Sequence, residues 1–162
     1  MSRKPFDLKA QSDALAKRLA QIPAEIVAEL RPALVKGAED LAGTMRLLVP
    51  EDEGDLEASI AVTAPGETTP AYASEGGRRT AGPNQALVTI GNPAVRHGHL
   101  VEFGTAPHTN GGLFAGTPNP GTEAQPFMQP AIRMTQAKVQ RRIATAIGRA
   151  IRKAAKEGQS NA

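Results

Sequence analysis

The sequence predicts an α+β fold in which a long N-terminal helix and a basic C-terminal helix accompany a small antiparallel sheet with long loops. Two apolar stripes of helical period, near the two ends of the chain, and short apolar runs between them indicate this order. Apolar residues make up 40% of the 162 residues, and the aromatic ones are four Phe and one Tyr. We therefore expect a single domain over residues 1–162 with a thin core that is completed by neighbouring subunits.

The first helix is expected over residues 7–48, where apolar residues recur at steps of three and four or their sums. Pro23 and Pro32 lie inside this stripe, and each removes an amide donor and crowds the preceding turn. We therefore expect a break near Pro23 and a kink or second break near Pro32. Pro50 ends the element.

An acidic segment follows this helix and leads into the sheet. It has some likeness to a calcium loop, but it lacks the alternating ligands and the distal Glu that such a loop needs. The better interpretation is a solvated turn in which Gly54 supplies an unusual backbone angle and Leu56 docks as the chain enters a strand.

Three short strands are predicted, over residues 59–64, 86–91 and 95–103. The segments between and after them, 65–85 and 104–125, are rich in Gly, Pro, Thr and Asn and have no apolar periodicity. Both are long for connections inside a compact domain. We therefore expect them to be arms that contact partners and lie outside the core.

The last helix is predicted to start just after Pro130 and to run to about Ala155, packed on the sheet, with a flexible tail over 157–162. Residues 131–156 hold eight basic and no acidic residues, whereas residues 1–130 hold 11 basic and 15 acidic ones. This helix should therefore meet an anionic partner, either an acidic protein face or DNA. The alternative without an anionic partner is a solvated helix whose Arg side-chain stems cover apolar surface. The candidate interface or DNA-channel residues are Arg78, Arg79, Arg133, Arg141, Arg142, Arg149 and Arg152.

No pattern in the sequence indicates an enzyme. His97 and His99 would share one strand face and could chelate a metal, but Glu102 falls on the other face, so ordinary strand histidines are the favoured interpretation. A lone Glu supports no hydrolase mechanism, and Ser59 lacks a nucleophile elbow. With no Cys in the chain, thiolate sites are excluded. We expect no cofactor and no metal.

Membrane attachment is not expected either. The N-terminal residues hold no apolar run after their basic residues, unlike a signal peptide. The sequence also has no run of eighteen apolar residues that could cross a bilayer.

Three ordered motifs carry a resemblance to a known family. They are Pro-x-x-x-Gly-x-Leu-x-x-Ser-Ile over 50–60, Leu-Val-Glu-Phe-Gly-Thr over 100–105 and Gln-Pro-Phe-Met-x-Pro-Ala over 125–131. The chain resembles, over about residues 10–155, the small phage head–tail joining and tail-completion proteins named after gene product ten of phage HK ninety-seven. Glu53 departs from the Thr of that family's first motif. The structural motif residues are Gly54, Leu56, Glu102, Phe103, Gly104, Pro126, Phe127 and Pro130.

The resemblance implies a structural virion protein at the neck or tail end of a long-tailed phage or phage-like particle, assembled in the host bacterial cytoplasm. Such proteins form rings, often of six subunits, through which DNA passes. The implied partners are further copies of the chain, head-closure, connector and tail-tube proteins, and packaged DNA contacted without sequence specificity. Within such a fold, Phe103 and Phe127 are expected to be core anchors. The alternatives are a double-stranded DNA-binding protein that uses the basic helix, and a metal-dependent enzyme built on the His pair.

Overall fold

A computed structural model describes residues 24–50, 54–73 and 77–160. The long helices are α2 (Ala24–Leu48) and α5 (Met128–Ser160), and the short ones are α3 (Asp55–Ala58) and α4 (Gly98–Phe103). The strands β1 (Ala61–Thr63) and β2 (Leu87–Thr89) form one pair, and β3 (His108–Thr109) and β4 (Pro118–Asn119) form another, with the 3-10 turn η1 (Gly112–Phe114) between them. The predicted α+β class, with its two long helices and small antiparallel sheet, is confirmed.

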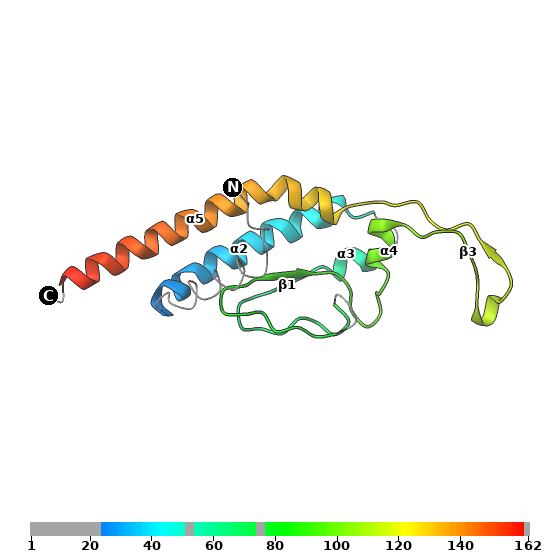
Figure 1. Cartoon of the computed structure of the whole chain (residues 1–162), viewed down its shortest axis with the longest axis horizontal. Helices are drawn as coiled ribbons and strands as arrows, with labels where there is room; N and C mark the ends of the chain where they lie inside the picture. Colours follow the sequence, from blue (N-terminus) through cyan, green and yellow to red (C-terminus); the bar gives the residue numbers. More distant parts are fainter. Residues whose placement is uncertain (1–23, 51–53, 74–76, 161–162) are drawn as a thin grey trace, which may run out of the picture.

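The molecule is elongated and layered (Figure 1). Helix α5 runs antiparallel along α2, and α2 in turn lies on the β1–β2 pair. The expected direct packing of the last helix on the sheet is therefore replaced mainly by packing on α2. In the antiparallel register Val62 stands opposite Val88, and both side chains pack against the core from the sheet.

The hydrophobic core is small and lies where α2, α3, the sheet and the start of α5 meet. Phe127 is fully buried at its centre, as predicted. Leu56 is also buried, and Gly54 before it has φ 80°, so the predicted turn and docking are confirmed. The buried members of this core are Ala42, Met45, Val49, Leu56, Ile60, Val95, Phe127 and Ala131.

The predicted third strand over 95–103 is wrong, because residues 98–103 form α4. Its buried positions, Gly98 and Glu102, are four residues apart, which is the spacing of one helical face. A short apolar run does not reveal by its periodicity whether it is strand or helix. Phe103, at the end of α4, is 69% exposed, so its assignment as a core anchor is also wrong.

Helix α2 is continuous through Pro32. Of the kink or second break expected there, the break is therefore wrong. Both Ala28 and Pro32 are exposed, so water can reach the carbonyl that loses its amide partner. The break expected near Pro23, and the residues of the apolar stripe that precede it, lie outside the described residues. At the other end of the chain, α5 begins two residues before Pro130 and extends to Ser160, beyond the expected end near Ala155.

The loop over 65–85 is more ordered than expected. Thr68 and Thr80 form an isolated bridge, and Ala81 donates its amide to the Glu67 carbonyl at 2.8 Å. Ala73 and Ala81 are buried, so part of this loop packs onto the domain instead of standing clear of it.

Candidate functional site

The second and third sequence motifs meet in one structure, which we call the clamp: residues 101–105 together with residues 122–131. Glu102, on α4, is 98% buried and its carboxylate faces the first turn of α5. Its Oε2 accepts the backbone amides of Phe127 at 2.7 Å and Met128 at 2.8 Å, and its Oε1 accepts the amide of Gln129 at 3.0 Å. These are amides that have no partner inside the helix.

Pro130 completes this arrangement because it has no amide to satisfy. With three amides bound to Glu102 and the next absent, the α5 ladder begins with Ala131, whose amide donates to the Phe127 carbonyl. The positive end of the helix dipole also favours a carboxylate at this position. Glu102 is therefore a helix cap supplied from 25 residues away in the sequence, and its role is structural.

The other contacts of the clamp join the two chain segments where they leave the domain. Gln125 donates its amide to the Val101 carbonyl at 2.8 Å, and Thr105 and Thr122 exchange backbone hydrogen bonds. Gly104 has φ 69°, and a Cβ there would stand 2.6 Å from the Thr122 carbonyl oxygen. Only glycine fits this backbone and this approach, which explains the Phe-Gly-Thr sequence after Glu102.

Beyond the clamp, residues 106–121 form a hairpin that we call the arm. Figure 1 shows it projecting from the end of the molecule, away from the layers. Its strands pair His108 with Asn119 and Thr109 with Pro118. At its tip Leu113 is 93% and Phe114 66% exposed. The arm therefore carries apolar side chains away from the hydrophobic core.

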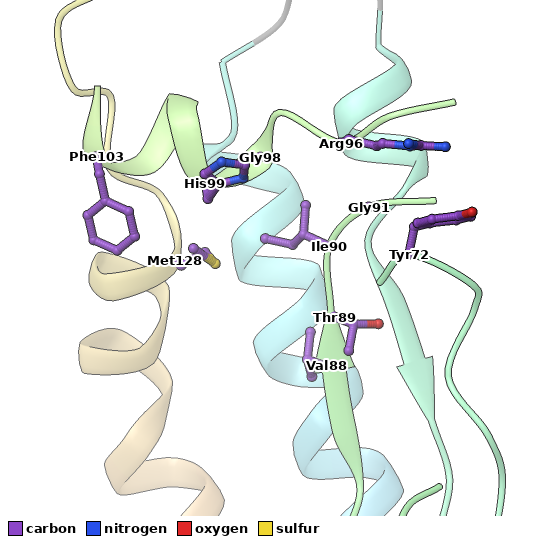
Figure 2. A pocket seen from close by; sticks show the side chains of 10 residues that line it. All are labelled: Tyr72, Val88, Thr89, Ile90, Gly91, Arg96, Gly98, His99, Phe103 and Met128. Carbon is purple, nitrogen blue, oxygen red and sulfur yellow. The ribbon is translucent and has the colours of Figure 1, made fainter. Parts of the chain in front are cut away.

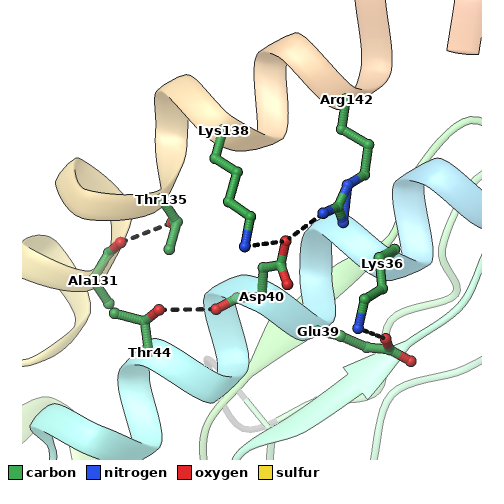
Figure 3. Close-up of polar contacts among 8 residues, drawn as sticks. All are labelled: Lys36, Glu39, Asp40, Thr44, Ala131, Thr135, Lys138 and Arg142. Atoms are coloured by element: carbon green, nitrogen blue, oxygen red, sulfur yellow. Dashed lines mark hydrogen bonds and ion pairs between the residues drawn. The ribbon is translucent and has the colours of Figure 1, made fainter. Parts of the chain in front are cut away.

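The basic residues of α5 divide into two groups. Lys138 and Arg142 both face the Asp40 Oδ2 on α2, at 3.2 and 3.0 Å, and Lys153 pairs with Glu29 (Figure 3 shows the Asp40 pairs). These are contacts that hold α5 against α2. The second group is exposed and, within the described ranges, has no acidic partner; it comprises Arg133, Arg141, Arg149, Arg152 and Lys156.

Most of the second group lies along one side of α5. Arg141, Arg149, Arg152 and Lys156 are separated by steps that place them along one side of α5, while Arg133 lies apart. Arg78 and Arg79 are exposed on the loop beside β2, where they line a cavity with Thr69 and Thr89. No hydrogen bond or ion pair among the described residues joins this Arg pair to α5.

The predicted His pair lies at the start of α4, not on a strand. His97 precedes the helix and His99 lies in its first turn, and both are exposed. His108 is on the arm, where its Nδ1 contacts the Ala106 carbonyl. No group of three His, Asp or Glu side chains that could hold a metal ion occurs in the described part of the chain.

Comparison with known families decides which kind of protein this is. The family model described as "Bacteriophage HK97-gp10, putative tail-component" matches residues 13–104, more than half of the chain. The chain belongs to this family. The matched range includes the first motif and the second up to Gly104, so it ends within the clamp. No curated protein and no solved structure gives a significant match.

As a member of this phage tail-component family, the chain is a structural protein of the virion. None of the helices within the described residues is both long and apolar enough to cross a bilayer. Sequence reasoning found the residues of the clamp but not their contacts. It also missed Asp40 and Glu29 as internal partners of the basic helix, because their proximity depends on the antiparallel packing of α2 and α5.

Proposed function

We propose that this chain completes the neck or tail end of a long-tailed phage or phage-like particle, and that it does so as a ring around the DNA channel. Six copies are the expected number. The ring would join heads to tails by contacting head-closure, connector and tail-tube proteins, and it would assemble in the cytoplasm of the host bacterium.

The clamped arm is the observation that carries this proposal. A buried carboxylate, two hydrogen-bonded chain segments and a glycine with positive φ together fix the direction of the arm. An apolar tip that is held away from the core has no use in an isolated molecule, because exposed apolar side chains lose the stabilisation that burial gives. It is useful where a second protein surface receives the tip.

The exposed basic side of α5 supports the same function. In a ring, a stripe of Arg and Lys residues suits either the DNA that passes through the channel or an acidic face of a neighbouring protein. The stripe would then contribute charge to assembly, whereas Lys138, Arg142 and Lys153 contribute to folding of the subunit.

Substitution of the arm tip tests this function. Leu113→Ser with Phe114→Ser should leave the thermal unfolding of the free subunit unchanged, because both side chains are exposed. The yield of infectious or DNA-transferring particles should fall strongly. Leu47→Ser, at an equally exposed apolar residue on α2, is the matched control. A double variant that joins heads to tails as well as the control would contradict the proposal.

The exposed Arg141, Arg149 and Arg152 also favour a second candidate function, that of a double-stranded DNA-binding protein. Such a protein would bind DNA with an affinity that falls steeply with salt, and it would need no assembly. The arm has no role in this alternative. DNA binding and particle yield of the arm-tip variants, with DNA binding measured at two salt concentrations, separate the two functions. Salt-sensitive DNA binding that the arm-tip substitutions leave unchanged, without any effect on particle yield, would favour the alternative.

A further inference from the structure

The β1–β2 sheet has an open edge, and that edge faces a trough. The sheet contains only two strands, so the outer side of β2 pairs with no strand of the described chain. In the same described part, residues 86–90 make no backbone hydrogen bond other than those to β1. Open edges of this kind are templates for another strand.

The trough runs between β2 and α5, above α2. Its two cavities, of about 680 and about 320 Å³, share Val88 on β2. Figure 2 shows one end of it, with Phe103 and Met128 beside the start of α5 and Ile90 just beyond the end of β2. Six apolar residues from the three elements that border it are Leu34, Leu41, Val88, Ile90, Ile132 and Ile143.

Neighbouring side chains of β2 face two sides. Val88 packs against the core, whereas Thr89 points the other way, and its buried hydroxyl forms no hydrogen bond with any described residue (Figure 2). The sheet itself is at the lower limit of size, since two strands alone are only marginally stable and depend here on α2.

We propose that this trough receives the arm of a second copy of the chain, which lies along β2 as the strand that the sheet lacks. The inference rests on the proposed ring function and names the contact that would build the ring. Backbone hydrogen bonds to the β2 edge would supply affinity, and the apolar tip would fill the cavities.

Charge and composition select the arm as the occupant. The charged side chain that lines the trough is Arg96, and no acidic residue lines it. The arm, residues 106–121, contains no Lys, Arg, Asp or Glu. It can therefore enter an apolar trough with little desolvation penalty.

The arm cannot serve its own trough. The clamp fixes residues 104 and 122 at the end of the molecule, and the arm projects away from the layers there (Figure 1). Each copy then donates one arm and accepts another, which is a heterologous contact. Repetition of such a contact closes into a ring when the rotation between copies permits it.

Photo-crosslinking tests the inference directly. A benzoylphenylalanine at position 114 would be placed in unlabelled chain and mixed with ¹⁵N-labelled chain under conditions in which rings form. We expect crosslinked peptides of mixed isotopes that join the arm to residues 86–91 or 128–143 of another copy. The same probe at Leu47, an exposed residue outside the trough lining, should give no crosslink to those residues.

Two neighbouring positions on α5 provide a matched pair of blocking variants. Gln136 is exposed and lines the trough, whereas Ala137 is exposed and does not. Gln136→Trp should fill the trough and reduce the position-114 crosslink to background, and Ala137→Trp should leave it intact. Circular dichroism would establish that both variants fold.

The outcomes separate this inference from the proposed function. Rings whose arm crosslinks within its own copy, to residues 1–23, or to another surface would overturn the inference and leave ring formation standing. A chain that stays monomeric even with its tail partners would overturn both. A position-114 crosslink that survives Gln136→Trp would also contradict the proposed seat of the arm.

Discussion

At the scale of single residues, the Glu of the Val-Glu-Phe-Gly-Thr motif has a physical explanation. Glu102 is buried, and its carboxylate accepts hydrogen bonds from three backbone amides at the start of α5, where the third motif lies. A carboxylate is suited to this task because both oxygens accept hydrogen bonds and the helix start is positive. An isolated Glu in a catalytic site would need a second acid or base, and the contacts of Glu102 are instead all with backbone amides.

Glu102→Gln should destabilise the chain. The amide keeps the shape, but its NH₂ group would face at least one backbone N–H where an acceptor is needed. We expect the free energy of unfolding to fall by about 2–3 kcal/mol, as for a charged hydrogen bond that is lost in a buried place. Urea denaturation measures this. Glu123→Gln, at an exposed carboxylate within the clamp, should change stability by less than about 0.5 kcal/mol. Equal effects of both variants would contradict the capping role.

The two motif phenylalanines should behave differently. Phe127→Ala empties a fully buried site and should cost about 3–5 kcal/mol of stability. Phe103→Ala removes a largely exposed ring and should cost under about 1 kcal/mol. Thermal melts of both variants decide this, and a Phe127 variant that melts like wild type but fails to assemble would make this ring an interface anchor.

The clamp residues could be selected from the sequence, but the reason for their importance could not. The motif pointed to Glu102, Gly104 and Phe127 together. It did not show that a carboxylate on one segment caps the helix of the other, because that contact is between residues 25 apart. Phe103 was misplaced because the strand assumed for it would have alternated inward and outward, whereas α4 turns it outward.

At the scale of elements, the proposed function depends on the arm and on α5. The long helices were predictable because their apolar positions repeat with the helical period over many turns. The antiparallel pairing of α2 with α5 was not predictable, since the periodicity shows which face of each helix is apolar but not which element packs against that face. This pairing gives some of the basic residues a role inside the subunit, because it brings Asp40 between Lys138 and Arg142.

Charge reversal on α5 should therefore have effects that depend on position. Arg142→Glu would set a like charge against Asp40 at a partly buried site and should lower stability by about 1–2 kcal/mol. Arg152→Glu, on the exposed side, should change stability by less than about 0.5 kcal/mol and should instead lower particle yield. Chemical denaturation and head–tail joining, measured on the same two variants, test the division. If Arg152→Glu leaves the particle yield intact, that side of α5 is a solvated surface with no part in assembly.

The arm should be the first element to be cut by proteases in the free subunit. Its backbone is held by few hydrogen bonds beyond the clamp, and residues 111–118 are all exposed. Limited proteolysis with identification of the cut sites should find cleavage near residues 110–118 before any cut in α2 or α5. Assembly should then protect the same sites. An arm that is resistant in the monomer would argue that it packs on its own subunit.

At the scale of the whole molecule, the thin core predicted from composition and the elongated shape have the same cause. The chain devotes much of its length to an arm, a long loop and a protruding helix, so few large side chains remain to be buried together. The sequence indicated this surplus of exposed structure, and family membership shows that the chain is a phage tail component. Of the two or three strands expected for the sheet, two are present, because the segment that was assigned to the third strand folds as α4.

Native mass spectrometry would show whether this phage tail component assembles into the ring that we propose. The chain would be measured alone and with the adjoining head and tail proteins, at low and moderate salt. We expect a closed assembly with one copy number, six being expected. Raising the salt should weaken this assembly, because screening acts on the basic side of α5. Monomers under every condition, with salt-sensitive affinity for DNA and no assembly, would contradict the claim and favour the DNA-binding alternative.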